Sequence, residues 1–335
     1  MSEAAATGAV AFVTGGTGFV GSHLVEALLA RGYAEVRCLV RSGRKWLGDL
    51  PITEVRGDLT DPAVLEAAVQ GVDYVYHVAG LTRATEWIDF AEANVHGTVR
   101  LLAAIEAVNP TVRKVLVTSS LAAIGACDVP IADETAPFRP LSMYGRSKAE
   151  MEKAIVAEGW LSRLPITIVR PPAVYGPREA DIFTFFKTVK QGVAPIMGDG
   201  NRPDLSLVHV QDLVDGMIAA AEHPATKGET YFLGSAEQYS WNTIKAATTA
   251  ALGRRALSIP VPLAFVKPIG AISEAVGKLL GQYPPLNRDK AYEIRHACKM
   301  CTSQKAMDAF GYAPSMPLDA GLRQTMGWYQ QEGWL

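Results

Sequence analysis

A tyrosine and a lysine four residues apart, Tyr144 and Lys148, are the side chains of this sequence best suited to acid–base chemistry. At that spacing the two lie one turn apart on the same face of a helix. An ammonium beside a phenol favours the phenolate, and so lowers a pKa that is otherwise about 10 towards neutral pH. A proton could then pass between the Tyr144 hydroxyl and a reacting oxygen. The pair alone is not specific, because tyrosine and lysine meet at this spacing in many helices.

Hydroxyl side chains follow an apolar run upstream of this pair. Residues 115–117 are Val-Leu-Val and are followed by Thr118, Ser119 and Ser120, which indicates a buried strand that ends in hydroxyls. In an open α/β sheet the carboxyl ends of the strands border the ligand crevice, so Ser119 or Ser120 should point into it. A hydroxyl in that place could hydrogen-bond the oxygen that receives a proton from Tyr144.

A glycine-rich turn near the start of the sequence could hold a pyrophosphate. The apolar run 10–13 precedes it and a helical stretch at 22–31 follows it, so the order is strand, turn, helix. In such a turn Gly15 permits the tight bend, Gly18 lets the phosphates approach the backbone, and Gly21 lets the helix pack closely on the sheet. The N–H groups and the dipole of the helix attract the anion. A purely structural turn is the alternative, and the flanking pattern favours nucleotide binding.

Apolar runs alternate with amphipathic stretches as far as about residue 170, which is typical of an α/β fold with a doubly wound parallel sheet. We expect a Rossmann-type nucleotide-binding domain over residues 1–170, with the strand order 3-2-1-4-5-6. Beyond Pro171 glycine, proline and short helical pieces dominate, so residues 171–335 should form a smaller, mixed substrate-binding region. This region should be interleaved with the first, with one strand at about 229–233 returning to the sheet. The expected strands of the first domain lie at 9–14, 34–40, 52–55, 72–78, 112–119 and 166–170.

The amino-acid composition limits the classes of protein to which this chain can belong. With 335 residues, of which 49% are apolar, the chain can bury a large core. Its formal net charge is −2 and its cations are scattered, so nothing indicates a nucleic-acid partner. The first residues lack the basic and apolar regions of a signal peptide, and no apolar run reaches about 18 residues. We therefore expect a cytoplasmic protein without an integral membrane segment.

The four cysteines are Cys38, Cys127, Cys298 and Cys301. The last two have a spacing that can bind zinc or cycle as a disulfide, but zinc needs two further ligands and His296 is the only obvious neighbour. We therefore expect no metal, and ordinary thiols in a reducing compartment.

The motifs occur together in one family, which the chain resembles over nearly its whole length: the extended short-chain dehydrogenases/reductases of the NAD(P)-dependent epimerase/dehydratase superfamily. The resemblance implies catalysis by Ser120, Tyr144 and Lys148, with Asn94 in support through the backbone or a water relay. For Asn94 a helix-start cap is an equal alternative. The implied cofactor site comprises Gly15, Thr17, Gly18, Phe19, Val20, Gly21, Asp58, Leu59, His77, Val78, Ala79, Gly80, Thr118, Tyr144, Lys148, Pro171, Ala173 and Val174. Substrate contacts are expected at Thr82, Ser120, Leu121, Tyr144 and Pro172.

Three helical stretches could do more than cover the sheet. By resemblance, residues 92–108 and 142–158 correspond to the helices through which many family members pair as homodimers. Residues 263–281 carry an apolar stripe at helical spacing. That stripe could pack on the core, form a lid over an apolar substrate, or touch a membrane surface. A smaller departure from the family is Gly80, which replaces the alanine of many members and leaves room for cofactor or substrate.

The end of the second strand bears on the choice of cofactor. In this family an acidic residue there binds the ribose 2′-hydroxyl of NAD, and an arginine accommodates the 2′-phosphate of NADP. Val40 takes the acidic position, and three cations follow it at Arg41, Arg44 and Lys45. Arg41 could bind a phosphate through two hydrogen bonds, supported by Arg44 or Lys45. We therefore expect NADP(H), with a solvated basic loop as the alternative.

Two further departures bear on the substrate. Sugar-nucleotide members of the family typically carry an asparagine and an arginine that engage the diphosphate, and this chain has Ala173 and Leu205 in those places. A shifted register would bring Arg202 in instead. The C-terminal pattern after Pro285 resembles the branch that contains 3β-hydroxysteroid dehydrogenases, dihydroflavonol reductase-like proteins and hopanoid-associated epimerase-like proteins. Those act mostly on apolar ring or chain substrates.

The sequence therefore favours an NADP(H)-dependent oxidoreductase that interconverts a ketone and a secondary alcohol on a steroid-, lipid- or aromatic-like substrate. In the reductive direction a hydride passes from the nicotinamide to the carbonyl while Tyr144 protonates the developing alkoxide and Ser120 stabilises it. Lys148 would lower the pKa of Tyr144 and hold the nicotinamide ribose. The alternatives are a sugar-nucleotide epimerase or dehydratase and a non-catalytic NADP(H)-sensing binding protein. The intact Ser120, Tyr144 and Lys148 argue against the last of these.

Overall fold

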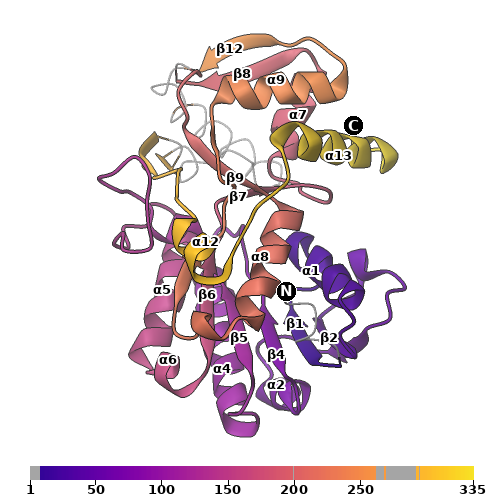
Figure 1. The fold of residues 1–335 in the computed structure, drawn as a ribbon, viewed down its shortest axis with the longest axis vertical. Helices are drawn as coiled ribbons and strands as arrows, with labels where there is room; N and C mark the ends of the chain where they lie inside the picture. The colour runs from indigo at the N-terminus through magenta and orange to yellow at the C-terminus, as the bar shows by residue number, and fades with distance from the viewer. Residues whose placement is uncertain (1–7, 199, 262–267, 269–291, 294) are drawn as a thin grey trace.

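The computed structural model describes residues 8–198, 200–261, 268, 292–293 and 295–335. At its centre is a seven-stranded parallel sheet in the order β10-β6-β5-β4-β1-β2-β3 (Figure 1). The expected order 3-2-1-4-5-6 is confirmed, and a seventh strand extends the sheet beyond β6. The strands are β1 (Val10–Thr14), β2 (Glu35–Val40), β3 (Thr53–Arg56), β4 (Tyr74–His77), β5 (Lys114–Thr118), β6 (Ile166–Arg170) and β10 (Thr230–Phe232).

Two groups of helices bury the two faces of this sheet. One apolar cluster joins the strands to α1 (Phe19–Ala30) and α8 (Val210–Glu222). The other cluster joins them to α2 (Pro62–Val69), α4 (Gly97–Val108) and α5 (Met143–Ala157). Because both faces are covered, the central strands are continuous apolar runs rather than alternating ones. The carboxyl ends of these strands are thereby held in fixed positions.

A smaller region lies above the large sheet in Figure 1. It contains a three-stranded sheet of β7 (Ala173–Tyr175), β9 (Leu205–His209) and β11 (Gln238–Tyr239), and a two-stranded sheet of β8 (Val193–Met197) and β12 (Leu257–Val261). Its helices α7 (Phe183–Lys190), α9 (Trp241–Leu252) and α13 (Leu318–Gln331) surround a core that is rich in aromatic side chains. The expected α/β fold with a smaller, mixed region is confirmed.

The last part of the chain returns to the large sheet. Ala306 and Tyr312 are buried in the cluster that contains α1 and α8, and Lys305 Nζ donates to the Thr230 carbonyl of β10 at 2.9 Å. The chain therefore passes between the two regions more than once. Its short helical pieces are η1 (Lys45–Leu47), α3 (Trp87–Phe90), η2 (Ala91–His96), η3 (Leu121–Ala123), α6 (Trp160–Arg163), η4 (Pro224–Thr226) and α12 (Gln304–Phe310).

A disulfide joins Cys127 to Cys298, whose Cα atoms are 5.5 Å apart, while Cys38 and Cys301 are free and buried. The expectation of ordinary thiols is therefore wrong for Cys127 and Cys298. The two cysteines are 171 residues apart in the sequence, so no local spacing could reveal the pair. Across the described residues, no group of three or more His, Cys, Asp and Glu side chains could hold a metal ion.

The apolar stripe at 263–281 lies outside the described residues apart from residue 268. Its role as core, lid or membrane contact therefore stays a prediction. Among the helices that the structure describes, none is both long enough and apolar enough to cross a bilayer.

Candidate functional site

A cavity of about 1440 Å³ lies at the carboxyl ends of the strands, where the large sheet meets the smaller region. Its walls come from the turn after β1, the ends of β2, β4 and β5, and the segments 171–174 and 178–182. The sequence-predicted residues that line it are Gly15, Thr17, Gly18, Phe19, Val20, Gly21, Arg41, Lys45, Asp58, Leu59, Val78, Ala79, Gly80, Thr82, Thr118, Ser120, Leu121, Tyr144, Lys148, Pro171, Pro172, Ala173 and Val174. Three others, Arg44, His77 and Asn94, do not line it.

The turn between β1 and α1 has no space for a side chain at two of its glycines. Gly15 has a φ of 77°, and a Cβ there would lie 2.5 Å from the backbone nitrogen of Ala79. A Cβ on Gly21 would collide with the carbonyl oxygen of Gly15. Gly18 is the N-cap residue of α1. The N–H groups of the first helical turn therefore lie beside the cavity, as binding of a pyrophosphate requires.

His77 supports this turn from behind rather than lining the cavity. Its Nδ1 lies 2.7 Å from the Thr14 hydroxyl and its Nε2 lies 2.8 Å from the Thr98 hydroxyl. Burial lowers the pKa of His77 to about 3, so the ring is neutral at physiological pH. The expected cofactor contact of His77 is thus corrected to a structural one, because both ring nitrogens are used to join β1, β4 and α4.

The cations at the end of β2 differ in what they contact. Arg41 and Lys45 line the cavity, and within the described part of the chain neither takes part in an ion pair. The Arg44 guanidinium instead donates to the Leu50 carbonyl at 2.8 Å and lies 3.7 Å from the Glu54 carboxylate. The expected support from Arg44 is therefore not met, because these local partners turn it away from the cavity. Lys45 remains as the second cation beside Arg41.

Ser120 and Tyr144 both line one end of the cavity, called the catalytic end for the roles that the sequence predicts for them. Ser142 is the N-cap of α5, and its Oγ accepts the N–H of Gly145 at 3.1 Å. This cap fixes the start of the helix and so places Tyr144 in its first turn. Burial raises the pKa of Tyr144 above its usual value; the neighbouring Ser120 hydroxyl opposes this shift and the charge of Glu293 adds to it.

Lys148 lies one turn further along α5, and its ammonium is held by the backbone. Nζ donates to the Thr118 carbonyl at 2.7 Å, and burial lowers the pKa of Lys148 to about 8. A Cβ on Gly80 would lie 3.1 Å from Nζ, so glycine there leaves room for the ammonium. The expectation that Lys148 brings down the pKa of Tyr144 is corrected, because burial of the phenol outweighs any such effect.

Asn94 positions the loop that follows β4. Its Oδ1 accepts the N–H of Leu81 at 2.7 Å, and its Nδ2 donates to the Leu81 carbonyl at 2.9 Å and to the Ser147 hydroxyl at 2.8 Å. The alternative of a helix-start cap is wrong, because Asn94 lies in the π-helical turn η2 between α3 and α4. Asn94 therefore ties the cavity wall to α5, and its support of catalysis stays a prediction.

The substrate end of the cavity is largely apolar. Ala173 and Leu205, the positions where sugar-nucleotide enzymes carry polar diphosphate contacts, both line it, and Arg202 does not. Because the neighbouring side chains come from segments far apart in the sequence, local motifs could not reveal most of them. The other apolar side chains here are Leu81, Ala84, Leu121, Ala122, Pro172, Ile182, Met197, Trp241 and Ala297.

The cations around this end are already engaged by carboxylates. Such ion pairs join Arg83 to Asp181, Arg178 to Glu26 at 2.6 Å, and Lys299 to Asp204 at 2.6 Å. No local pattern in the sequence predicts these pairs, because their partners are 95 to 152 residues apart. A negatively charged ligand would therefore have to compete with a protein carboxylate for each of them.

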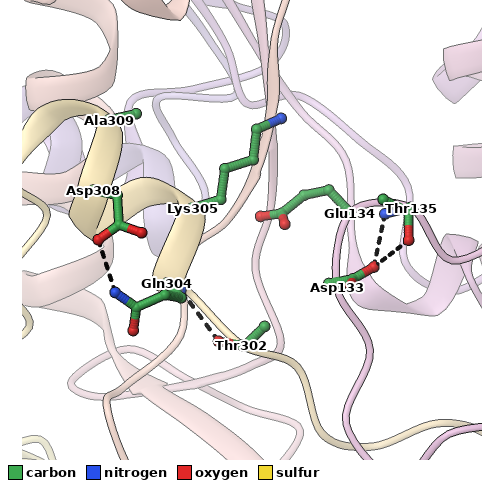
Figure 2. Close-up of a pocket in the computed structure, with 8 residues that line it drawn as sticks. All are labelled: Asp133, Glu134, Thr135, Thr302, Gln304, Lys305, Asp308 and Ala309. Atoms are coloured by element: carbon green, nitrogen blue, oxygen red, sulfur yellow. Dashed lines mark hydrogen bonds between the residues drawn. The ribbon is translucent and has the colours of Figure 1, made fainter.

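A smaller hollow of about 650 Å³ lies between residues 133–135 and α12 (Figure 2). Its charged groups hold the edge of the large sheet. Glu134 accepts the N–H of Phe232 at 2.7 Å, and Lys305 pairs with Glu229 at 2.7 Å. These contacts cover the edge strand β10, and we assign them a structural role.

The doubly wound fold, the glycine turn and the Ser120–Tyr144–Lys148 group together define an oxidoreductase that uses a nicotinamide dinucleotide. The model of the NAD dependent epimerase/dehydratase family matches residues 11–234, and the chain belongs to this family.

Relatives from different branches of the family are similar to the chain over nearly its whole length. A ceramide reductase of Caulobacter vibrioides is 30% identical over 333 residues, which are 98% of this chain and 97% of the relative. A 3-beta-hydroxysteroid dehydrogenase of Mycolicibacterium neoaurum is 27% identical over 332 residues, 95% of this chain and 90% of the relative. The structure of DesIV, a dTDP-glucose 4,6-dehydratase from Streptomyces venezuelae with NAD and TYD bound, has a TM-score of 0.77 and 25% identity, covering 97% of this chain and 98% of that chain. The resemblance to this superfamily and to its hydroxysteroid dehydrogenase branch is confirmed.

Proposed function

We propose that the protein is an NADP(H)-dependent oxidoreductase that interconverts a ketone and a secondary alcohol on an apolar, steroid-, lipid- or aromatic-like substrate. The observation that carries this proposal is the substrate end of the cavity, where Ala173 and Leu205 are apolar and the cations are paired with carboxylates. A diphosphate there would be desolvated without gaining an unpaired cation. An apolar ligand gains about 25 cal/mol for each Å² removed from water.

The residues of the cavity fit NADP(H). The turn at Gly15 and Gly21 leaves room for a pyrophosphate, and Arg41 and Lys45 can bind the 2′-phosphate. The Thr118 hydroxyl is buried in the cavity wall and, within the described chain, makes no hydrogen bond. A buried hydroxyl without a partner is unfavourable, so Thr118 supports a ligand at this place.

Residues of the chain itself supply the proton and stabilise the substrate oxygen. When bound, the nicotinamide supplies or accepts the hydride. Tyr144 donates its proton as negative charge develops on the oxygen, and its raised pKa keeps the phenol protonated at neutral pH. The Ser120 hydroxyl stabilises the same oxygen by a hydrogen bond. Lys148 orients the nicotinamide ribose with an ammonium that the Thr118 carbonyl holds in place.

The relatives support two kinds of substrate. The names of the ceramide reductase and of the 3-beta-hydroxysteroid dehydrogenase support a lipid- or steroid-like substrate. The likeness to DesIV, a dTDP-glucose 4,6-dehydratase, supports a sugar-nucleotide substrate instead. The apolar side chains and the paired cations favour the first kind. A sugar-nucleotide epimerase or dehydratase is the alternative that the experiment must exclude.

The test is a substrate screen with NADPH. Steroid ketones, long-chain 3-oxo compounds and aromatic ketones are assayed for NADPH oxidation, and UDP-, GDP- and dTDP-sugars are titrated by calorimetry into the protein saturated with NADPH. We expect turnover of at least one apolar ketone and no micromolar binding of a sugar nucleotide. Micromolar binding of a sugar nucleotide would reverse the assignment, and Arg202 would then be the first residue to replace.

Three further expectations stay proposals. We infer a homodimer through α4 and α5, whose Val108 and Val156 are 38% and 60% exposed and would be covered by pairing. We also propose a cytoplasmic location, and a division of the chain near residue 170 into a cofactor-binding domain and a substrate-binding region. The mass of the protein in solution tests the first of these.

A further inference from the structure

The loop that follows β2, residues 41–47 and called the cationic loop below, carries a tryptophan as well as its cations. Trp46 is half-buried in the short helical turn η1, next to Lys45. Lys45 lines the cavity, whereas Trp46 does not. The φ of Lys45 is 45°, in the left-handed region that residues other than glycine rarely adopt. Because such a conformation persists only where surrounding contacts hold it, the contacts of this loop must maintain the backbone at Lys45.

The side chain of Trp46 contacts an arginine from the wall of the cavity. The Arg178 guanidinium lies 5.7 Å from the centroid of the Trp46 ring, within the range of a cation–π contact. The same guanidinium donates to the Ser22 hydroxyl at 3.0 Å and to the Glu26 carboxylate at 2.6 Å, both on α1. Arg178 has a φ of 74°, and in the described chain it and Lys45 are the non-glycine residues with a positive φ. Both strained positions thus adjoin Trp46.

Trp46 also reaches α13 and the residues that follow this helix. Its ring centroid lies 5.5 Å from that of Trp328 and 6.4 Å from that of Trp334, within the range of aromatic pairs. Both partners pack on Tyr329, at 5.7 and 5.5 Å. The Tyr329 hydroxyl is anchored in turn, because it donates to the Glu179 carbonyl at 2.8 Å. The aromatic core of the smaller region therefore holds the cationic loop of the large sheet.

We propose that Trp46 is a positioning residue for the 2′-phosphate of the cofactor. Its contacts with α13 and with Arg178 hold the backbone at Lys45, so that the Lys45 ammonium stays beside the cavity. There it can pair with the phosphate together with Arg41. Among the described residues none of α13 lines the cavity, so the preference for a phosphate-bearing cofactor depends on a helix that does not touch it. This inference rests on the proposed function, because it explains how the same site holds NADP(H).

The test uses two adenosine nucleotides that lack the nicotinamide. 2′,5′-ADP carries the 2′-phosphate and 5′-AMP does not, so the ratio of their affinities, measured by calorimetry, reports on the cationic loop without turnover. The wild type should favour 2′,5′-ADP by about 100-fold, since two charge-assisted contacts contribute about tenfold each or more. Trp46→Ala should lower this ratio by about tenfold, the share of one contact, and leave the affinity for 5′-AMP nearly unchanged. Trp46→Phe keeps an aromatic ring and should retain most of the ratio.

A double-mutant cycle tests whether Trp46 acts through Lys45. Lys45→Ala should itself lower the ratio by about tenfold, because it removes one charge-assisted contact. Adding Trp46→Ala to it should lower the ratio by less than about twofold further, since the side chain that Trp46 positions is already gone. Two losses that simply multiply would overturn the proposal. Trp328→Ala removes the contact from the side of α13 and should lower the ratio in the same direction as Trp46→Ala.

Trp87→Ala is the matched control. The Trp87 indole is also half-buried and lies 4.1 Å from the Arg146 guanidinium, but it belongs to α3 and does not line the cavity. Its replacement should leave the ratio unchanged. A wild-type ratio in Trp46→Ala or in Trp328→Ala, or equal losses for both nucleotides, would overturn the positioning role and leave the proposed cofactor intact. Equal binding of the two nucleotides by the wild type would count against NADP(H) itself, and with it against the role of Trp46.

Discussion

At the catalytic end of the cavity, removal of the Tyr144 hydroxyl should slow the chemical step without weakening the binding of the cofactor. Tyr144→Phe should lower kcat/KM for ketone reduction by about 10²–10⁴-fold, because a general acid contributes that much. Its affinity for NADPH should stay nearly unchanged, as measured by fluorescence titration.

Tyr312→Phe is the control, because it deletes a buried hydroxyl that makes no hydrogen bond in the described structure and that lies away from the cavity. It should keep full activity. A Tyr144→Phe protein with most of its kcat would remove Tyr144 from the mechanism and favour the NADP(H)-sensing alternative.

The two arginines at the end of β2 make a second comparison. Arg41 lines the cavity, whereas Arg44 is engaged by Leu50 and Glu54. Arg41→Ala should weaken NADPH binding by about 1.5–3 kcal/mol, or roughly 10- to 150-fold, because it loses a charge-assisted contact to the 2′-phosphate. Binding of NADH should hardly change. Calorimetry measures both, and Arg44→Ala should leave the ratio of the two affinities as it is in the wild type.

The pH profile reports on Lys148. Its pKa is lowered to about 8 by burial, so the ammonium is present below about pH 8 and is lost above it. The pKa of Tyr144 is raised, so the phenol is still protonated in that range. We therefore expect kcat/KM for reduction to fall above about pH 8. A profile that stays flat to pH 10 would contradict the assignment of this limb to Lys148.

Among single residues, the sequence could predict those whose role is set by local spacing. Tyr144 and Lys148 depend on one helical turn, and the glycine turn depends on one strand and one helix. Glu293 could not be predicted, because its place beside Tyr144 depends on contacts between residues about 150 positions apart. Arg44 was misassigned because neighbouring cations on one loop have the same sequence pattern, and only their side-chain contacts distinguish them.

At the scale of secondary structure, a buried ion pair joins α5 to the sheet behind the catalytic residues. Arg170 of β6 forms hydrogen bonds with Glu152 of α5 at 2.7 and 2.9 Å, and both side chains are almost fully buried. The Ser119 hydroxyl at the end of β5 donates to the same carboxylate at 2.5 Å. The network therefore ties α5, which carries Tyr144 and Lys148, to β6 and to the end of β5, which Ser120 follows.

Removal of one partner should be costly. Glu152→Gln should lower the free energy of unfolding by about 3–5 kcal/mol, because it leaves the buried Arg170 guanidinium without a counter-charge. Arg323→Ala on α13 is the control, since its pair with Asp319 is exposed and such pairs contribute only about 0.3–0.5 kcal/mol. Urea denaturation measures both. A loss below 1 kcal/mol in Glu152→Gln would show that this network does not hold α5 to the sheet.

The order of strands and helices follows from the alternation of apolar runs, and the sequence predicts it well. The helix expected at 92–108 begins earlier, at Trp87, and contains the π-helical turn η2. That difference could not be predicted, because the extra residue of a π turn has no compositional signature of its own. In the structure the turn places Asn94 so that its amide reaches both Leu81 and Ser147.

For the whole molecule, the boundary between the large sheet and the smaller region can be predicted only in part from the sequence. The pattern changes after Pro171, but β10 and α12 bring later residues back to the large sheet. Long-range contacts of this kind carry no local signal, which is why the walls of the substrate end could not be predicted from motifs. The cofactor end could be, because a single strand–turn–helix unit builds most of it.

The bridge between Cys127 and Cys298 also determines what a single break in the backbone can do. It closes a stretch with a sequence separation of 171 residues into a covalent ring. A protease that cuts once inside that ring leaves both fragments attached to each other. On a denaturing gel the nicked protein should run as one band without reductant and as two bands with it. The same digest of Cys298→Ser should give two bands under both conditions, and two bands from the unreduced wild type would mean that the bridge had not formed. While the bridge is intact, a single cut within this ring therefore cannot separate the parts of the catalytic site that lie on the two fragments.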